Sequence, residues 1–151
     1  MTHIPKAPLW LGLAGLIPFV WGAVVTLGLF SAQMGDPSSG GYPLVIPADG
    51  PLIMIRYGTV ILAFMSGVLW GFATRSDHAI GYVLSVIPAL WAFGMIGNGP
   101  VSAATNLIFG FVGLLLLDWQ FSRQGLTPSW WMPLRILLTT IVIICLLTAV
   151  I

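Results

Sequence analysis

Five long apolar stretches occupy most of this 151-residue chain and constrain its fold more than any other feature. A helix needs roughly 20 predominantly apolar residues to cross the hydrocarbon core of a bilayer. Charged residues make up only 6% of the chain, whereas a soluble domain carries about a quarter. The stretches are also too long and too uniformly apolar to be barrel strands, which alternate. The sequence therefore predicts an all-α polytopic membrane protein with a single domain over residues 1–151. Its five expected transmembrane helices lie at about 9–30, 52–73, 80–97, 101–117 and 133–151.

The basic residues predict the orientation of these helices. If the amino terminus is cytoplasmic, Lys6, Arg75, Arg123 and Arg135 lie on the inner side and only Arg56 lies towards the outside. This distribution obeys the positive-inside rule. We therefore expect a cytoplasmic amino terminus and, after five crossings, a carboxyl terminus on the outside.

The long connection at 31–51 is rich in Gly and Pro, which block regular structure, and it is expected on the outer side. Loops of this length are often functional. Two interpretations stay open, a lid over the mouth of the helix bundle and a plain tether between two helices.

Several function classes are disfavoured by composition. A net charge of +1, with the charges gathered at predicted helix ends, offers no basic surface for nucleic acid. Cys145 is the only cysteine, so neither a disulfide within the chain nor a thiol-based metal site is expected. His3 and His78 fall at the inner interface and form no haem or zinc motif. No acid–base pair lies within the helices, so we expect no catalytic residue, no metal and no cofactor, and a protein that is not an enzyme.

Two stripes of small residues are expected to be helix-packing surfaces, because such residues let transmembrane backbones approach closely. The predicted helix at 133–151 has no Gly and is expected at the periphery, facing lipid or a partner. The stripes comprise Thr59, Ala63, Gly67 and Gly71 in the second predicted helix and Gly81, Ser85 and Ala89 in the third.

A short pattern, I-P-x-x-W, occurs twice, with Pro18 and Trp21 in the first predicted helix and Pro88 and Trp91 in the third. Each proline lacks the amide hydrogen that would bond the carbonyl four residues earlier, so both helices are expected to kink. Two interpretations stay open. The kinks frame a ligand cavity near the middle of the membrane, or the prolines are merely tolerated and the tryptophans pack.

Ionisable residues near the hydrocarbon are functional candidates by default. Asp118 is expected on the same side as Arg75, Arg123 and Arg135, which favours a structural ion pair. Arg56 stands alone on the outer side, where it either reaches the headgroups and Asp49 or binds an anionic headgroup or ligand.

Four segments together resemble a known family: LGLAGLIPF at 11–19, RYGTVILAFMSGVLWGFA at 56–73, SVIP at 85–88 and WMPLR at 131–135. The chain resembles the uncharacterised bacterial family that includes mitochondrial transmembrane protein 69. This resemblance implies a small helical bundle in the bacterial cytoplasmic (inner) membrane and brings no established activity. Many members of that family have His at the position of Leu69, so any role of that His is absent or altered here. The matching motifs add Tyr57 and Trp70 to the candidate ligand-binding residues, which are Pro18, Trp21, Arg56, Tyr57, Trp70, Pro88 and Trp91.

The leading hypothesis from sequence is a non-catalytic accessory or assembly component of a larger membrane complex, with membrane lipid and either that complex or further copies of the chain in a homo-oligomer as its partners. It depends on the lack of a catalytic cluster and of a soluble domain, and on the apolar last helix. The alternative is a binder, sensor or carrier of a small hydrophobic or anionic ligand such as a lipid, quinone or pigment. A transporter is the third hypothesis, since only the kinks favour it.

Overall fold

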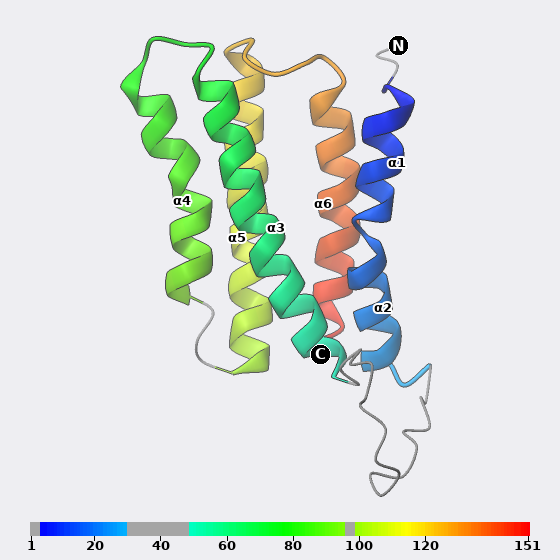
Figure 1. The fold of residues 1–151 in the computed structure, drawn as a ribbon. Helices are drawn as coiled ribbons and strands as arrows, with labels where there is room; N and C mark the ends of the chain where they lie inside the picture. The colour runs from blue at the N-terminus through cyan, green and yellow to red at the C-terminus, as the bar shows by residue number, and fades with distance from the viewer. Residues whose placement is uncertain (1–3, 30–48, 96–98) are drawn as a thin grey trace, which may run out of the picture.

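The computed structural model describes residues 4–29, 49–95 and 99–151, and all the regular structure within them is helical. This confirms the predicted all-α class (Figure 1). Most of the loop expected at 31–51 lies outside the described residues, so its lid or tether role stays a prediction. The helices are α1 (Lys6–Ala14), α2 (Ile17–Thr26), α3 (Gly50–Ala73), α4 (Ala79–Met95), α5 (Pro100–Arg123) and α6 (Trp131–Leu147).

The first predicted helix is divided into α1 and α2, and Pro18 explains the break. A proline has no amide hydrogen, so the hydrogen-bond ladder is interrupted in the turn before it. The amide of Leu16 bonds the carbonyl of Leu13, three residues back, at 3.0 Å. Pro18 then occupies the first turn of α2, where a missing donor costs least. Pro88, by contrast, lies inside a continuous α4.

Within the described residues, three apolar segments are long enough to cross a membrane: residues 6–26, which join α1 and α2, together with α3 and α5. The helices α4 and α6 are apolar but shorter. Helix α1 begins and α6 ends at opposite ends of the bundle (Figure 1).

Helix α3 runs diagonally through the bundle, from α2 at its first residues to α4 at its last (Figure 1). It begins with an N-cap, in which Asp49 Oδ1 accepts the amide of Leu52 at 3.0 Å. Gly22 and Gly50 allow the close crossing of α2 and α3, since a Cβ on Gly22 would lie 2.9 Å from the Gly50 carbonyl oxygen. Beyond this crossing, α3 diverges from the segment formed by α1 and α2, so that α1 packs on α6 rather than on α3.

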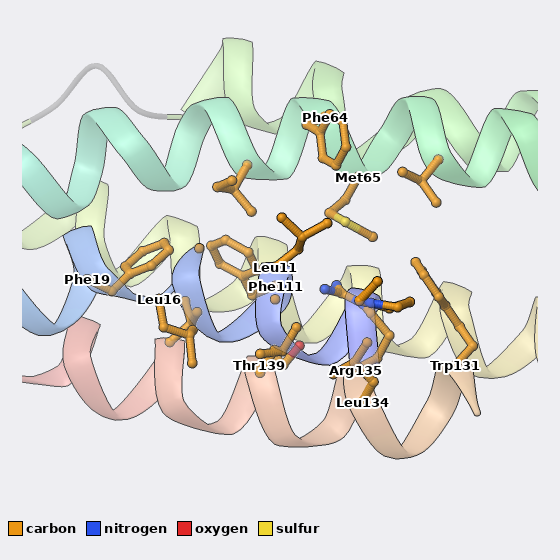
Figure 2. Close-up of a pocket in the computed structure, with 18 residues that line it drawn as sticks. Leu11, Leu16, Phe19, Phe64, Met65, Phe111, Trp131, Leu134, Arg135 and Thr139 are labelled. Atoms are coloured by element: carbon orange, nitrogen blue, oxygen red, sulfur yellow. The ribbon is translucent and has the colours of Figure 1, made fainter. Parts of the chain in front are cut away.

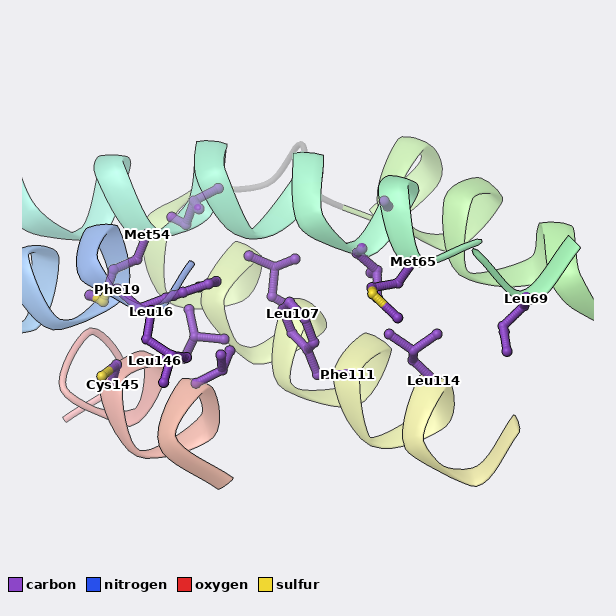
Figure 3. Packing of buried hydrophobic residues seen from close by; sticks show 14 of the residues in the cluster. Leu16, Phe19, Met54, Met65, Leu69, Leu107, Phe111, Leu114, Cys145 and Leu146 are labelled. Atoms are coloured by element: carbon purple, nitrogen blue, oxygen red, sulfur yellow. The ribbon is translucent and has the colours of Figure 1, made fainter. Parts of the chain in front are cut away.

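The core lies along α3 and α5, where fully buried side chains interlock with α2 and α6. Figure 3 shows Phe19 of α2 beside Met54 of α3 and, further along, Leu107, Phe111 and Leu114 of α5. The Phe19 and Phe111 rings meet edge to face with centroids 6.0 Å apart.

The last helix is less peripheral than expected, because one face packs on other helices, but its other face is exposed at Ile136, Leu137, Ile144 and Leu147. Helix α6 packs on α5, α2 and α1, and its buried residues include Arg135 and Thr139 as well as apolar side chains. Helix α1 is the least enclosed, since it contacts α6 and none of its residues is buried, whereas α4 packs on α3 and α5. The absence of Gly therefore did not prevent one face of α6 from packing on other helices.

The two small-residue stripes behave differently. In the α4 stripe, Gly81 and Ser85 are buried against α3, where the Ser66 hydroxyl donates to the Ser85 carbonyl, and Ala89 is half-buried. In the α3 stripe, the Thr59 hydroxyl donates to the Ile55 carbonyl of its own helix. The residues of the α3 stripe that face outward are Ala63, Gly67 and Gly71. Nothing lies within 4 Å of a Cβ placed on either of these glycines. Packing of this part of the stripe inside the bundle is therefore a wrong prediction.

Candidate ligand cavity and buried ion pair

A buried ion pair joins α5 to α6. Arg135 Nε donates to Asp118 Oδ2 at 2.7 Å, and both side chains are almost completely enclosed. The other carboxylate oxygen, Oδ1, accepts the indole N–H of Trp131 at 2.8 Å. Both oxygens of Asp118 thus have a donor, as a buried charge requires.

The start of α6 positions these donors. Trp131 and Arg135 are one helical turn apart, so both reach the end of α5 from the same face of α6. The connection from α5 turns at Gly125, whose φ is +73°. Arg75 Nη1 ties the end of α3 to this connection by donating to the Leu126 carbonyl at 3.3 Å.

Beside the ion pair is a cavity of about 510 Å³ between α1, α3 and α6, with Phe111 of α5 at its inner wall (Figure 2). It occupies the region where α1 and α3 diverge. Leu11 of α1 and Phe64 of α3 line it and are exposed, at 74% and 64%, so they mark its opening on the side of the bundle. The other lining residues are Ala7, Pro8, Gly12, Gly15, Leu16, Phe19, Ile61, Met65, Val68, Trp131, Leu134, Arg135, Leu138, Thr139 and Val142.

Two hydrogen-bonding groups in this apolar wall lack a partner. Arg135 Nη2 and Thr139 Oγ1 are buried and make no hydrogen bond, although their side chains line the cavity. The guanidinium extends from α6 into the space below Met65 in Figure 2. The arrangement combines a large apolar surface with two unpaired polar groups one helical turn apart on α6, and small-molecule sites commonly combine an apolar lining with a few polar groups.

Family comparison agrees with this membrane architecture. The family described as "Protein of unknown function (DUF3429)" matches residues 4–151. The chain belongs to the DUF3429 family. It is also 31% identical to Transmembrane protein 69 of Xenopus tropicalis over 158 residues, an alignment that covers all of this chain and 56% of that protein. The chain thus spans about half the length of this relative. No solved structure matches the chain.

The predicted resemblance is therefore confirmed, and this DUF3429 member is a membrane protein. Position 69, where relatives were expected to carry His, holds a fully buried Leu69 on α3. A side chain there faces the core and not the cavity, because Leu69 is absent from the lining.

Of the predicted ion-pair residues in this DUF3429 chain, only Arg135 meets Asp118. Arg75 bonds the Leu126 carbonyl, and Arg123 is exposed with its guanidinium carbon 5.0 Å from the Trp119 ring centroid. Within the described residues, the Asp118–Arg135 contact is the sole salt bridge. Burial explains why Asp118 pairs with Arg135, since Arg135 is buried whereas Arg75 and Arg123 are exposed.

The predicted ligand-binding residues do not come together. Trp91 of α4 donates to the Asn106 carbonyl of α5 at 2.8 Å, whereas Trp21 of α2 lines a separate shallow hollow with Ile141 of α6. Of the two interpretations of the proline motifs, this favours tolerated prolines with packed tryptophans over a single cavity framed by both motifs. None of the seven candidates lines the larger cavity, namely Pro18, Trp21, Arg56, Tyr57, Trp70, Pro88 and Trp91.

The remaining candidates have local roles. Arg56 is exposed on the second turn of α3, and the Tyr57 ring lies edge-on to Phe19 with centroids 5.3 Å apart. Trp70 meets Tyr82 of α4 in the same manner, at 4.9 Å. Within the described residues no group of three His, Cys, Asp or Glu side chains could hold a metal ion.

Thr139 and the cavity itself were missed at the sequence level. A signal exists in retrospect, because Trp131, Arg135 and Thr139 are spaced by four residues and place a polar line on one face of an apolar helix. No comparable sequence pattern indicates that α1 diverges from α3.

Proposed function

We propose that this protein spans the membrane several times and binds a small lipophilic molecule in the cavity between α1, α3 and α6. The observation that carries the proposal is the cavity of about 510 Å³, an apolar space with polar groups at one place on its wall. Voids larger than a water molecule are few in a packed protein interior. A space of this size at a lateral opening suits a molecule that partitions into the bilayer.

The opening supports entry from lipid. Leu11 and Phe64 lie in the middle of α1 and α3, within segments long enough to span a membrane, and both side chains point outwards. A ligand dissolved among acyl chains reaches the cavity between these residues without passing through water.

The accessory or assembly role expected from the sequence remains a second proposal. It relied on a last helix facing a partner, and α6 packs on α1, α2 and α5 with one face while Ile136 and Ile144 are exposed on the other. The cytoplasmic amino terminus, the bacterial inner membrane and the lack of enzymatic activity likewise remain proposals.

The test is purification from the native membrane in mild detergent, followed by native mass spectrometry. Wild-type protein is expected to carry a lipophilic mass. Val68→Trp, which places a larger side chain on the α3 wall of the cavity, is expected to lose that mass. The matched control is Val83→Trp on the exposed face of α4, which should retain it. A bare wild-type protein, or equal loading of all three proteins, rules out the ligand-binding function; a stoichiometric protein partner favours the accessory role.

A further inference from the structure

We infer, building on the ligand-binding function proposed above, that the cavity selects a neutral lipid with a carbonyl oxygen as its head. Arg135 Nη2 and Thr139 Oγ1 bind that oxygen, and the apolar wall receives the chain. The inference depends on three features of the cavity wall: unpaired donors, a charge already neutralised, and the spacing of the two donors.

The unpaired donors define what the head must supply. Arg135 is 5% exposed and Thr139 is 2% exposed, yet Nη2 and Oγ1 make no hydrogen bond with any residue that the structure describes. A guanidinium nitrogen only donates, and a hydroxyl is able to donate. Leaving such groups buried without partners costs stability. A ligand that accepts hydrogen bonds at this point removes that cost, whereas a pure hydrocarbon does not.

The charge of the site favours a neutral acceptor over a carboxylate. Arg135 is already paired with Asp118 at 2.7 Å, so the positive charge of the guanidinium is balanced before a ligand arrives. Among the residues that the structure describes, no other charged side chain lines the cavity. A carboxylate head would therefore leave one uncompensated negative charge in apolar surroundings, which is strongly unfavourable. An ester, ketone or quinone carbonyl accepts the same hydrogen bonds without that penalty.

The spacing of the donors fits a single polar head. Arg135 and Thr139 are four residues apart on α6, so their Cβ atoms are about 5–6 Å apart on one helix face. A carbonyl oxygen has two lone pairs and is able to accept from both sides. The wall opposite them is formed by Met65 and Val68 of α3 and is apolar, so the rest of the ligand needs no polar atom.

Three probes with carbon chains of the same length test the inference: methyl hexadecanoate, ionised hexadecanoic acid and hexadecane. Each is titrated into delipidated full-length protein in an alkyl maltoside, a detergent without a carbonyl, and binding is followed by native mass spectrometry. We expect the ester to bind at least about fivefold more tightly than either other probe, the size of one net hydrogen bond.

Thr139→Val removes the hydroxyl and keeps the shape of the side chain. It should weaken ester binding by about fivefold and leave hexadecane unchanged. Thr140→Val is the matched control, because Thr140 is on the same helix but exposed and bonded to the Ile136 carbonyl. Asp118→Asn is the second variant. It uncovers the charge of Arg135, so the preference should shift from the ester to the acid.

The outcomes separate this inference from the function on which it rests. If no probe binds, both are overturned. If hexadecane binds as tightly as the ester, or the acid binds more tightly in wild-type protein, the cavity still binds lipophiles and only the neutral-carbonyl inference is overturned.

The carbonyl itself has two possible sources, a bilayer phospholipid ester or a smaller neutral lipid. Nanodiscs of ester-linked and ether-linked phospholipid distinguish them, because ether lipids have no carbonyl. Weaker probe binding in the ester nanodiscs identifies the bilayer lipid as the occupant, and equal binding identifies the smaller lipid. Both results support the carbonyl class.

Discussion

Arg135 Nε lies 2.7 Å from Asp118 Oδ2, and this contact joins the end of α5 to the second turn of α6 at the wall of the cavity. The same arginine has a second, unpaired nitrogen, Nη2. One side chain thus serves both the packing of two helices and the polar part of the candidate site. Substitutions at the pair are therefore expected to affect both stability and ligand binding.

Asp118→Ala should lower the free energy of unfolding by about 3–5 kcal/mol, because removing one partner of a buried pair leaves an uncompensated charge. Thermal unfolding in detergent, followed by far-ultraviolet circular dichroism, measures the effect. The double variant Asp118→Leu/Arg135→Met should recover most of the loss, since neither charge remains. Asp77→Asn at an exposed turn is the control and should match wild type. A wild-type stability for Asp118→Ala contradicts this account of the pair.

Trp131→Phe tests the indole donor separately. The substitution keeps an aromatic ring against Phe72, whose centroid is 5.0 Å away, but removes the hydrogen bond to Asp118 Oδ1. Loss of a hydrogen bond to a charged group predicts a decrease of about 1.5–3 kcal/mol in unfolding free energy. Trp119→Phe, at an exposed position of α5, should change it little. Equal stability of the two variants would show that the indole N–H contributes nothing.

Sequence was sufficient for the helical class and for the approximate helix positions, because long apolar stretches have one stable arrangement in lipid. The break before α2 also followed from a local rule, the missing amide of Pro18. The sequence predicts an ion pair for Asp118 but does not distinguish Arg75, Arg123 and Arg135 as its partner. Which one is buried depends on the turn between α5 and α6, a tertiary feature that helix-end positions do not encode.

The cavity was beyond sequence-level prediction for a physical reason. Its space arises because Gly22 and Gly50 bring α2 and α3 together at one end while α1 stays with α6 at the other. Crossing geometry of this kind depends on three helices at once. Periodicity along one helix identified stripes but not their partners, so Gly67 and Gly71 were placed inside the bundle when they face outward.

The crossing of α2 and α3 makes a testable contrast between glycines. Gly50→Ala should destabilise the fold by about 1–3 kcal/mol, because the added methyl meets the backbone amide of Thr26 at 2.8 Å and a backbone cannot yield as a side chain does. Gly67→Ala meets nothing within 4 Å and gains helix propensity, so stability should be unchanged or higher by up to about 1 kcal/mol. Thermal unfolding of both variants in the same detergent measures the two changes in stability. Equal destabilisation would mean that close approach at Gly50 is not required.

The orientation in the membrane is open to a direct test by cysteine labelling. Ser129 lies in the connection before α6, at the end of the bundle near Arg75 and Arg123, whereas Ser102 lies in the first turn of α5 at the opposite end (Figure 1). Because the basic residues gather at the Ser129 end, the positive-inside rule predicts that this end is cytoplasmic. In a Cys145→Ala background, a membrane-impermeant maleimide should modify Ser102→Cys in intact cells. Ser129→Cys should react only after the cells are permeabilised. The reverse labelling pattern would invert the orientation and place the polar wall of the cavity, with Arg135, towards the outer interface.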